Sequence, residues 1–60
     1  MKWGELRRID ESKGWYLARH GANHDIYRHD DISELLLIDR HESQEIRNGL
    51  YLKNRKLIGF

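Results

Sequence analysis

The feature that most constrains the fold is a run of four consecutive aliphatic residues, Leu35–Ile38, inside the segment 32–38. A short continuous apolar run is typical of a buried strand, but it also fits a short buried helix, and periodicity alone does not decide. The run follows two strand-like segments and precedes a polar loop at 39–45. We therefore interpret 32–38 as a strand, the third of a sheet.

The two preceding segments favour a pair of short strands joined by a turn. Residues 15–18, Trp-Tyr-Leu-Ala, are rich in strand formers, and 26–28, Ile-Tyr-Arg, form a second short strand-like run. Gly21 lies between them and marks the turn, while the polar pair at 30–31 closes the second strand. Together with 32–38 these segments predict a three-stranded antiparallel sheet.

One helix is expected before the predicted strands in the sequence, and one after them. Trp3, Leu6 and Ile9 recur at helical spacing, and Gly14 is a plausible stop for that helix. From 48 onward a second helix is expected. An arc of about 120° on its helical wheel collects Leu50, Tyr51, Leu57 and Ile58, with Asn54 in the middle.

The order α-β-β-β-α predicts an α+β fold in which two helices pack on one face of the sheet, with residues 1–60 as one domain. A chain of this length buries only about 60% of its extended surface, so a partner that binds the folded form would add stability. Trp3, Trp15, Tyr16 and Tyr51 are expected in the core, whereas Tyr27 could be offered to a nucleic-acid base.

Composition excludes several classes of protein. The chain has no cysteine, which rules out a disulfide scaffold and a thiolate metal site. No segment approaches the roughly 18 apolar residues that span a bilayer, and the first residues lack a signal run, so we expect a soluble cytoplasmic protein without a membrane partner. Three histidines fall within 20–29, but their spacing matches no standard zinc pattern.

Charge is distributed unevenly along the chain. The net charge is +1, but residues 29–46 hold one arginine against six acidic side chains, and residues 47–60 hold four basic side chains and no acid. Local positive potential is what a polyanion such as RNA meets at close range. The alternative is that these charged side chains are simply solvated at the protein surface and bind no partner.

The tetrapeptide Gly21-Ala22-Asn23-His24 carries the best candidate for a catalytic group, His24. A lone histidine after a turn is more often an exposed loop residue. A geometric conflict also arises, because His24, Ile26 and Arg28 share one face of a regular strand and cannot serve both core and catalysis. A bulge at the turn, or a strand end that projects beyond the helices, would resolve it.

Five segments in this order resemble the HicA family of bacterial toxins, small RNases with a fold like the double-stranded-RNA-binding domain. The family's Gly-Ser-x-His signature is matched with Ala22 in place of serine. The chain departs from the family at Arg47 and at 49–50, and it has Asn54 and Arg55 where the family places leucines. The matching segments are 2–8, 14–17, 21–24, 41–46 and 56–60.

The resemblance implies a toxin that cleaves mRNA and is neutralised by a HicB-like antitoxin. His24 carries over as the catalytic residue, and no metal or other cofactor is implied. An imidazole with a pKa of about 6.5 can take the proton from a 2′-hydroxyl at neutral pH and return one. The expected products are a 2′,3′-cyclic phosphate and a 5′-hydroxyl.

Six further residues are expected to contact RNA or to support the chemistry. The arginines flank the turn, the lysines lie on the last helix, and His41 is the candidate for a second acid. They are Arg19, Asn23, Arg28, His41, Lys53 and Lys56. The alternatives are a non-cleaving RNA-binding or antitoxin-binding module, and a small interaction domain with no nucleic-acid role. A homodimer and a toxin–antitoxin hetero-oligomer are both compatible with the sequence.

Overall fold

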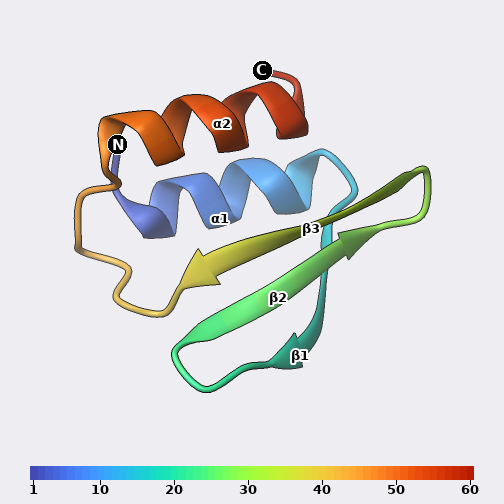
Figure 1. Cartoon of the computed structure of the whole chain (residues 1–60), viewed down its shortest axis with the longest axis horizontal. Helices are drawn as coiled ribbons and strands as arrows, with labels where there is room; N and C mark the ends of the chain where they lie inside the picture. The colour runs from blue at the N-terminus through green and yellow to red at the C-terminus, as the bar shows by residue number, and fades with distance from the viewer.

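The computed structural model describes residues 1–60 and has the predicted order α-β-β-β-α (Figure 1). Its elements are α1 (Trp3–Ser12), β1 (Tyr16–His20), β2 (His24–His29), β3 (Ile32–Asp39) and α2 (Asn48–Ile58). The aliphatic run 35–38 lies in β3, so the strand interpretation is confirmed. Helix α1 ends before Gly14, whose φ of 94° is a left-handed conformation that glycine adopts without strain.

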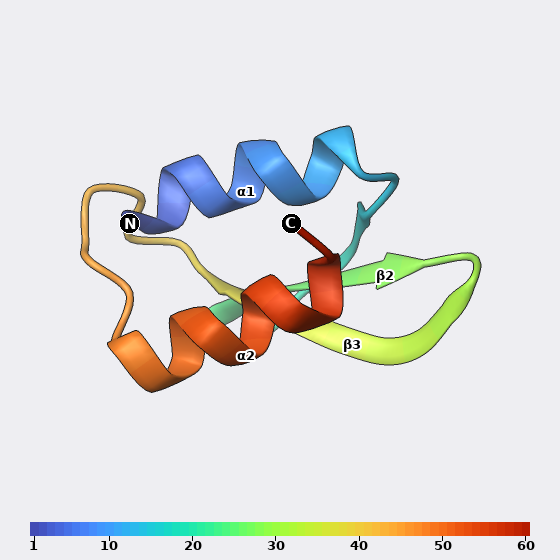
Figure 2. The same ribbon diagram turned by 90° about the horizontal axis from the view of Figure 1, so that it is seen from above.

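The strands form one antiparallel sheet in the order β1-β2-β3, so β2 is the central strand. Helices α1 and α2 lie side by side on the same face of this sheet and run in roughly the same direction (Figures 1 and 2). The predicted layer arrangement is therefore confirmed. Neither helix is long and apolar enough to cross a membrane.

The core lies between the helices and the covered face of the sheet. Because side chains alternate along a strand, Tyr27 in β2 and both Leu36 and Ile38 in β3 point toward the helices and are buried. The eight buried apolar residues are Trp3, Leu6, Trp15, Tyr27, Leu36, Ile38, Ile46 and Ile58.

The opposite face of the sheet is not covered by either helix. We call it the open face; it carries His24, Ile26 and Arg28 from β2 and Leu35 and Leu37 from β3. Leu37 is 50% exposed and Ile26 is partly buried. The sequence suggests a conflict, because His24 shares a face of β2 with Ile26, and it offers a bulge or a projecting strand end as solutions. The structure resolves the conflict in another way: the core lies on the opposite face of β2, where Asp25 and Tyr27 are buried.

A bulge in β1 sets which side chains reach each face. Leu17 pairs with Tyr27 and Arg19 pairs with Ile26, so Ala18 is the extra residue. Leu17 and Arg19 would share a face in a regular strand, but the bulge places Arg19 on the open face opposite Ile26. The next residue, His20, consequently points to the covered face.

Two expectations about aromatic residues are wrong. Tyr16 is 46% exposed because it lies on the open face of an edge strand, opposite Arg28. Tyr27 is only 1% exposed and cannot stack on a base, because it is on the covered face of the central strand. In both cases the face of the strand decides, and strand-forming residues alone do not specify the face.

The burial of side chains along α2 agrees in part with the arc predicted from the helical wheel. Asn54 and Ile58 are buried, as their places in the arc predict, while Tyr51 and Leu57 are partly buried. Leu50 departs from the arc and is 41% exposed, because it is in the first turn of α2.

Candidate functional site

His24 is the first residue of β2 and its side chain is exposed on the open face. It pairs with Asp39, the last residue of β3, so the two side chains lie next to each other at one end of the sheet. A hollow of about 460 Å³ opens at this position. Its lining residues are Trp3, His24, Asp39, Gln44, Glu45, Arg47 and Leu50.

Gly21 closes the turn that leads to His24. Its N–H donates a hydrogen bond of 2.7 Å to the carbonyl oxygen of His24. A Cβ atom at Gly21 would lie 2.8 Å from that same oxygen, closer than carbon and oxygen tolerate. The glycine is therefore required by the close approach of two backbone segments, and it fixes where His24 begins the strand.

Asp25, the residue after His24, points to the covered face and is contacted by two arginine side chains and one histidine side chain. Its carboxylate accepts hydrogen bonds from Arg7 (3.0 Å), from His20 (2.6 Å) and from Arg40 (2.9 Å). The Asp25 side chain is only 6% exposed. Burial would raise the pKa of this carboxyl, but the hydrogen bonds from Arg40, His20 and Arg7 outweigh it and hold the pKa well below its ordinary range.

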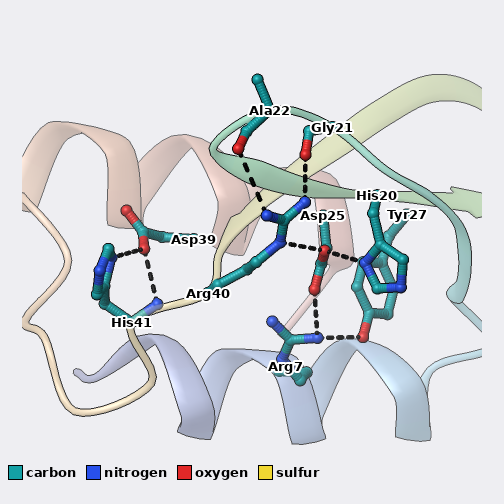
Figure 3. Close-up of polar contacts among 9 residues, drawn as sticks. All are labelled: Arg7, His20, Gly21, Ala22, Asp25, Tyr27, Asp39, Arg40 and His41. Atoms are coloured by element: carbon teal, nitrogen blue, oxygen red, sulfur yellow. Dashed lines mark hydrogen bonds and ion pairs between the residues drawn. The ribbon is translucent and has the colours of Figure 1, made fainter.

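Arg40 links this buried carboxylate to the turn before His24. Its Nε donates to Asp25, while its two terminal nitrogens donate to the carbonyl oxygens of Gly21 and Ala22 (Figure 3). The guanidinium thus bonds to residues on both sides of His24 in the chain. It makes no hydrogen bond to the imidazole of His24.

The network extends from Asp25 toward α1. Arg7 donates to the Tyr27 hydroxyl at 2.9 Å, and this hydroxyl donates to Glu11 at 2.9 Å. Burial, together with the hydrogen bond to Glu11, raises the pKa of Tyr27 to about 12, so the phenol stays neutral and continues to donate. Helix α1 is in this way tied to the central strand beneath the site.

Asp39, the cross-strand neighbour of His24, forms a second polar pair with His41 (Figure 3). One oxygen of Asp39 accepts from the His41 backbone N–H and from its Nδ1, each at 2.8 Å. These backbone and side-chain hydrogen bonds lower the pKa of Asp39 below its ordinary value. Because an ionised carboxylate only accepts, Nδ1 of His41 carries the proton and Nε2 is left free.

The two predicted arginines lie on the open face at different distances from His24. Arg19 pairs with Ile26, which is two residues along β2 from His24, and Arg28 is four residues along. At about 3.3 Å per residue these offsets are roughly 7 Å and 13 Å. Arg19 is therefore the nearer cation, and Asn23 is exposed in the turn itself.

The structure does not bring Lys53 and Lys56 to His24. Both lysines line a separate hollow of about 540 Å³ together with Ile32 and Glu34, the beginning of β3. His24 pairs with the end of β3 instead, roughly 20 Å away along the strand. Any contact of these lysines with RNA is thus remote from the histidine.

Sequence reasoning missed Asp25 and Arg40. A signal for Asp25 was present, because alternation along β2 puts it on the face opposite His24, where a buried carboxylate needs cationic partners. Nothing in the sequence indicates that Arg40, fifteen residues later in a polar loop, is one of those partners. The two other histidines within 20–29 have separate roles, since His20 bonds to Asp25 and His29 bonds to the Lys13 carbonyl oxygen.

Comparison with known proteins gives one match. A family model described as the HicA toxin of bacterial toxin–antitoxin systems matches residues 3–60, almost the whole chain. No curated protein and no solved structure matches the chain significantly.

Proposed function

Since the chain belongs to the HicA family of bacterial toxins, we propose that it is an mRNA-cleaving endoribonuclease with His24 as the general base. The observation that carries this proposal is the placement of His24. It is exposed at a strand end, it lines a hollow of about 460 Å³, and the turn before it is held by Gly21 and Arg40. A rigidly placed, accessible imidazole is what proton transfer to or from RNA requires.

The proposed reaction is an internal transesterification. His24 takes the proton of a 2′-hydroxyl as that oxygen attacks the adjacent phosphorus, and the bond from phosphorus to the 5′-oxygen breaks. His41, whose side chain is exposed, is the group proposed to protonate the departing 5′-oxygen; for this step its imidazolium form carries a proton on Nε2 as well as the one that Nδ1 donates to Asp39. The products are a 2′,3′-cyclic phosphate and a 5′-hydroxyl, and the residues named need no metal ion for this step.

The hollow is lined by one cation, Arg47, and by two carboxylates, of which Asp39 bonds to His41 and Glu45 bonds to the N-terminal amine, so Arg47 is the lining group that supports the binding of a phosphate. Arg47 also precedes the first turn of α2, which has no acidic residue and no side-chain cap. The amides of such a first turn have no partner within the helix and favour an anion. Arg19 adds a further positive charge on the open face, opposite Ile26 and so two residues along β2 from His24.

A protein partner is the other part of the proposal. The family is one of toxin–antitoxin pairs, and the proposed partner is a HicB-like antitoxin that covers His24. Leu35 and Leu37 are each about half exposed on the same face as His24. A partner that covered the histidine and these two leucines would bury apolar surface, which favours association.

The test is cleavage of RNA by the purified chain in the presence of EDTA. Replacing His24 by alanine should lower kcat about 10²–10⁴-fold, the usual contribution of a general base. RNA affinity, measured by fluorescence anisotropy, should change little, and circular dichroism should confirm that the variant is folded. His41→Ala tests the second acid, and its loss should remove the alkaline limb of the pH–rate profile.

Product analysis provides an independent check. RNA fragments carrying a 5′-phosphate would contradict the proposed chemistry, because attack by a 2′-oxygen always leaves a 5′-hydroxyl. Equal activity of wild type and His24→Ala would remove His24 from the mechanism.

A second candidate function is a non-cleaving module that binds RNA or an antitoxin. The exposed leucines on the open face favour a protein-binding role, which requires no chemistry at His24. RNA binding that weakens steeply with salt, without cleavage, would identify this function.

A further inference from the structure

We propose that Arg40, held by the buried Asp25, is a positioning residue that fixes the turn carrying His24 for RNA cleavage. The inference deepens the proposed function and rests on it. Arg40 touches neither the imidazole nor the hollow beside it; its role is to hold the backbone on both sides of His24.

Asp25 is the fixed point of this arrangement. Its side chain is 6% exposed and is tied to α1 by Arg7 and to β1 by His20. A carboxylate bonded from two different elements cannot move without breaking those bonds. Arg40 is therefore bonded to a rigid part of the molecule, although its own side chain is 39% exposed.

The shape of the guanidinium suits the distances that must be bridged. One edge of Arg40 meets Asp25, and the other nitrogens meet the carbonyl oxygens of Gly21 and Ala22. Five donors in a planar fork can satisfy three acceptors at fixed angles, whereas a lysine ammonium is a single point of charge. We call these three contacts of Arg40, with Asp25, Gly21 and Ala22, the clamp. A positive charge alone at this position should not reproduce them.

The clamp also joins the two histidines of the proposed reaction. Arg40 lies in the chain between Asp39 and His41, and its side chain crosses to the turn before His24. Loss of the guanidinium would release the turn relative to the end of β3. Misplacement of a catalytic group by about 1 Å is enough to cost about 10²-fold in rate.

The test compares Arg40→Gln and Arg40→Lys with Arg8→Gln in the purified full chain. Arg8 is exposed and makes no hydrogen bond or ion pair, so its variant controls for the loss of one positive charge. Both Arg40 variants should lower kcat about 10²-fold with KM unchanged within threefold. Arg8→Gln should retain the wild-type kcat.

A second measurement follows the turn directly by amide hydrogen exchange. The Gly21 N–H is bonded to the His24 carbonyl oxygen, so its protection reports whether the turn stays closed. Protection of Gly21 should fall at least tenfold in both Arg40 variants, while amides in the middle of β3 keep theirs. A uniform loss along the chain would indicate general destabilisation and overturn the positioning role.

The outcomes separate the two proposals. If the wild type cleaves RNA, His24→Ala does not, and Arg40→Gln keeps the wild-type kcat, then only the clamp is refuted. Rescue of kcat by Arg40→Lys, or a rise in KM with unchanged kcat, would make Arg40 a simple phosphate contact and also refute the clamp. If the wild type cleaves no RNA, the proposed function and the clamp both fail.

Discussion

Two buried aspartates, Asp25 under the site and Asp10 in α1, occupy opposite electrostatic environments. The Asp25 carboxylate bonds to two arginines and a histidine. Asp10 is completely buried next to the buried apolar residues of α1, and neither of its carboxylate oxygens has a hydrogen-bond partner of normal geometry. Asp25 thus joins several elements of the fold through its hydrogen bonds, whereas the carboxylate of Asp10 is buried without a partner.

The pKa values of the two carboxyls move in opposite directions for this reason. Cationic hydrogen-bond partners hold the pKa of Asp25 well below its ordinary range. Burial, helped by the nearby Glu11 charge, raises the pKa of Asp10 to about 7, and Arg7 and the Glu11 amide offset this only in part. Burial alone disfavours the ionised form of both carboxyls, and the hydrogen-bond partners decide in which direction each pKa finally moves.

The largest effect is expected from Asp25→Asn. The variant leaves Arg7 and Arg40 with a neutral partner in a buried place, and removal of one member of a buried ion pair costs about 3 kcal/mol or more. A 60-residue domain has roughly 3–9 kcal/mol of total stability at 0.05–0.15 kcal/mol per residue, so much of it would be lost. Urea unfolding at pH 7 measures the change.

Asp30→Asn is the matched control, because Asp30 is exposed in the β2–β3 turn and its carboxylate has no hydrogen-bond partner. It should leave the unfolding free energy within about 0.5 kcal/mol of wild type. If Asp25→Asn is unfolded at the start, the comparison is made in sucrose, which favours the compact state. Equal stability of the two variants would show that the Asp25 hydrogen bonds contribute nothing net.

The next largest effect concerns the pH dependence that Asp10 imposes. Its pKa is about 7 in the folded chain and about 3.9 when unfolded, so the folded state holds the proton more tightly. Stability from this group is complete below about pH 4 and is lost as pH rises to about 7. Between pH 5 and pH 8 the expected loss is about 3 kcal/mol, and it should vanish in Asp10→Asn.

Asp25 acts in the opposite sense and outside that window. Its lowered pKa gives stability that is present above about pH 4 and lost only in stronger acid. The difference between wild type and Asp10→Asn, measured by urea unfolding at several pH values from 5 to 8, therefore isolates Asp10. Parallel curves for the two proteins would mean that the Asp10 charge is compensated in the folded state.

The contrast between these aspartates also shows how much of the structure could be predicted from the sequence. Helical spacing at Trp3, Leu6 and Ile9 was sufficient to predict α1, whereas the aliphatic run 35–38 predicted β3 only together with its place after two strand-like segments. The placement of His24 on an open face was not predictable, because it depends on which face of β2 the helices cover. Local pattern specifies an element but not the side of it that is buried.

Long-range polar partners were the least accessible to prediction. The hydrogen bond from Arg40 to Asp25 joins residues fifteen positions apart, and the one from Arg7 joins residues eighteen apart. Asp10 lies seven residues after Trp3 and four after Leu6, on the apolar stripe of α1, but its burial was not predicted because a charged side chain is usually exposed. Asn54 was the exception, since its place in the middle of the wheel predicted the burial that the structure has.

Asn54→Leu should give the smallest effect and the clearest contrast with Asp10. Asn54 is 5% exposed, and its side-chain nitrogen is buried without a hydrogen-bond partner. Removing an unsatisfied neutral donor should raise the unfolding free energy by about 1–2 kcal/mol. For a domain of this size the melting temperature should rise by about 4–8 °C per kcal/mol, measured by circular dichroism.

The pH dependence of this gain distinguishes the two unsatisfied groups. Asn54 does not titrate, so the gain from Asn54→Leu should be equal at pH 5 and pH 8, whereas the gain from Asp10→Asn should appear mainly at pH 8. Asn48→Leu, at the exposed first residue of α2, controls for added apolar surface and should change stability little. A fall in stability for Asn54→Leu would mean that the larger side chain does not fit between α2 and the sheet. The polar residue would then be a packing requirement of this chain, unlike the unpartnered charge of Asp10.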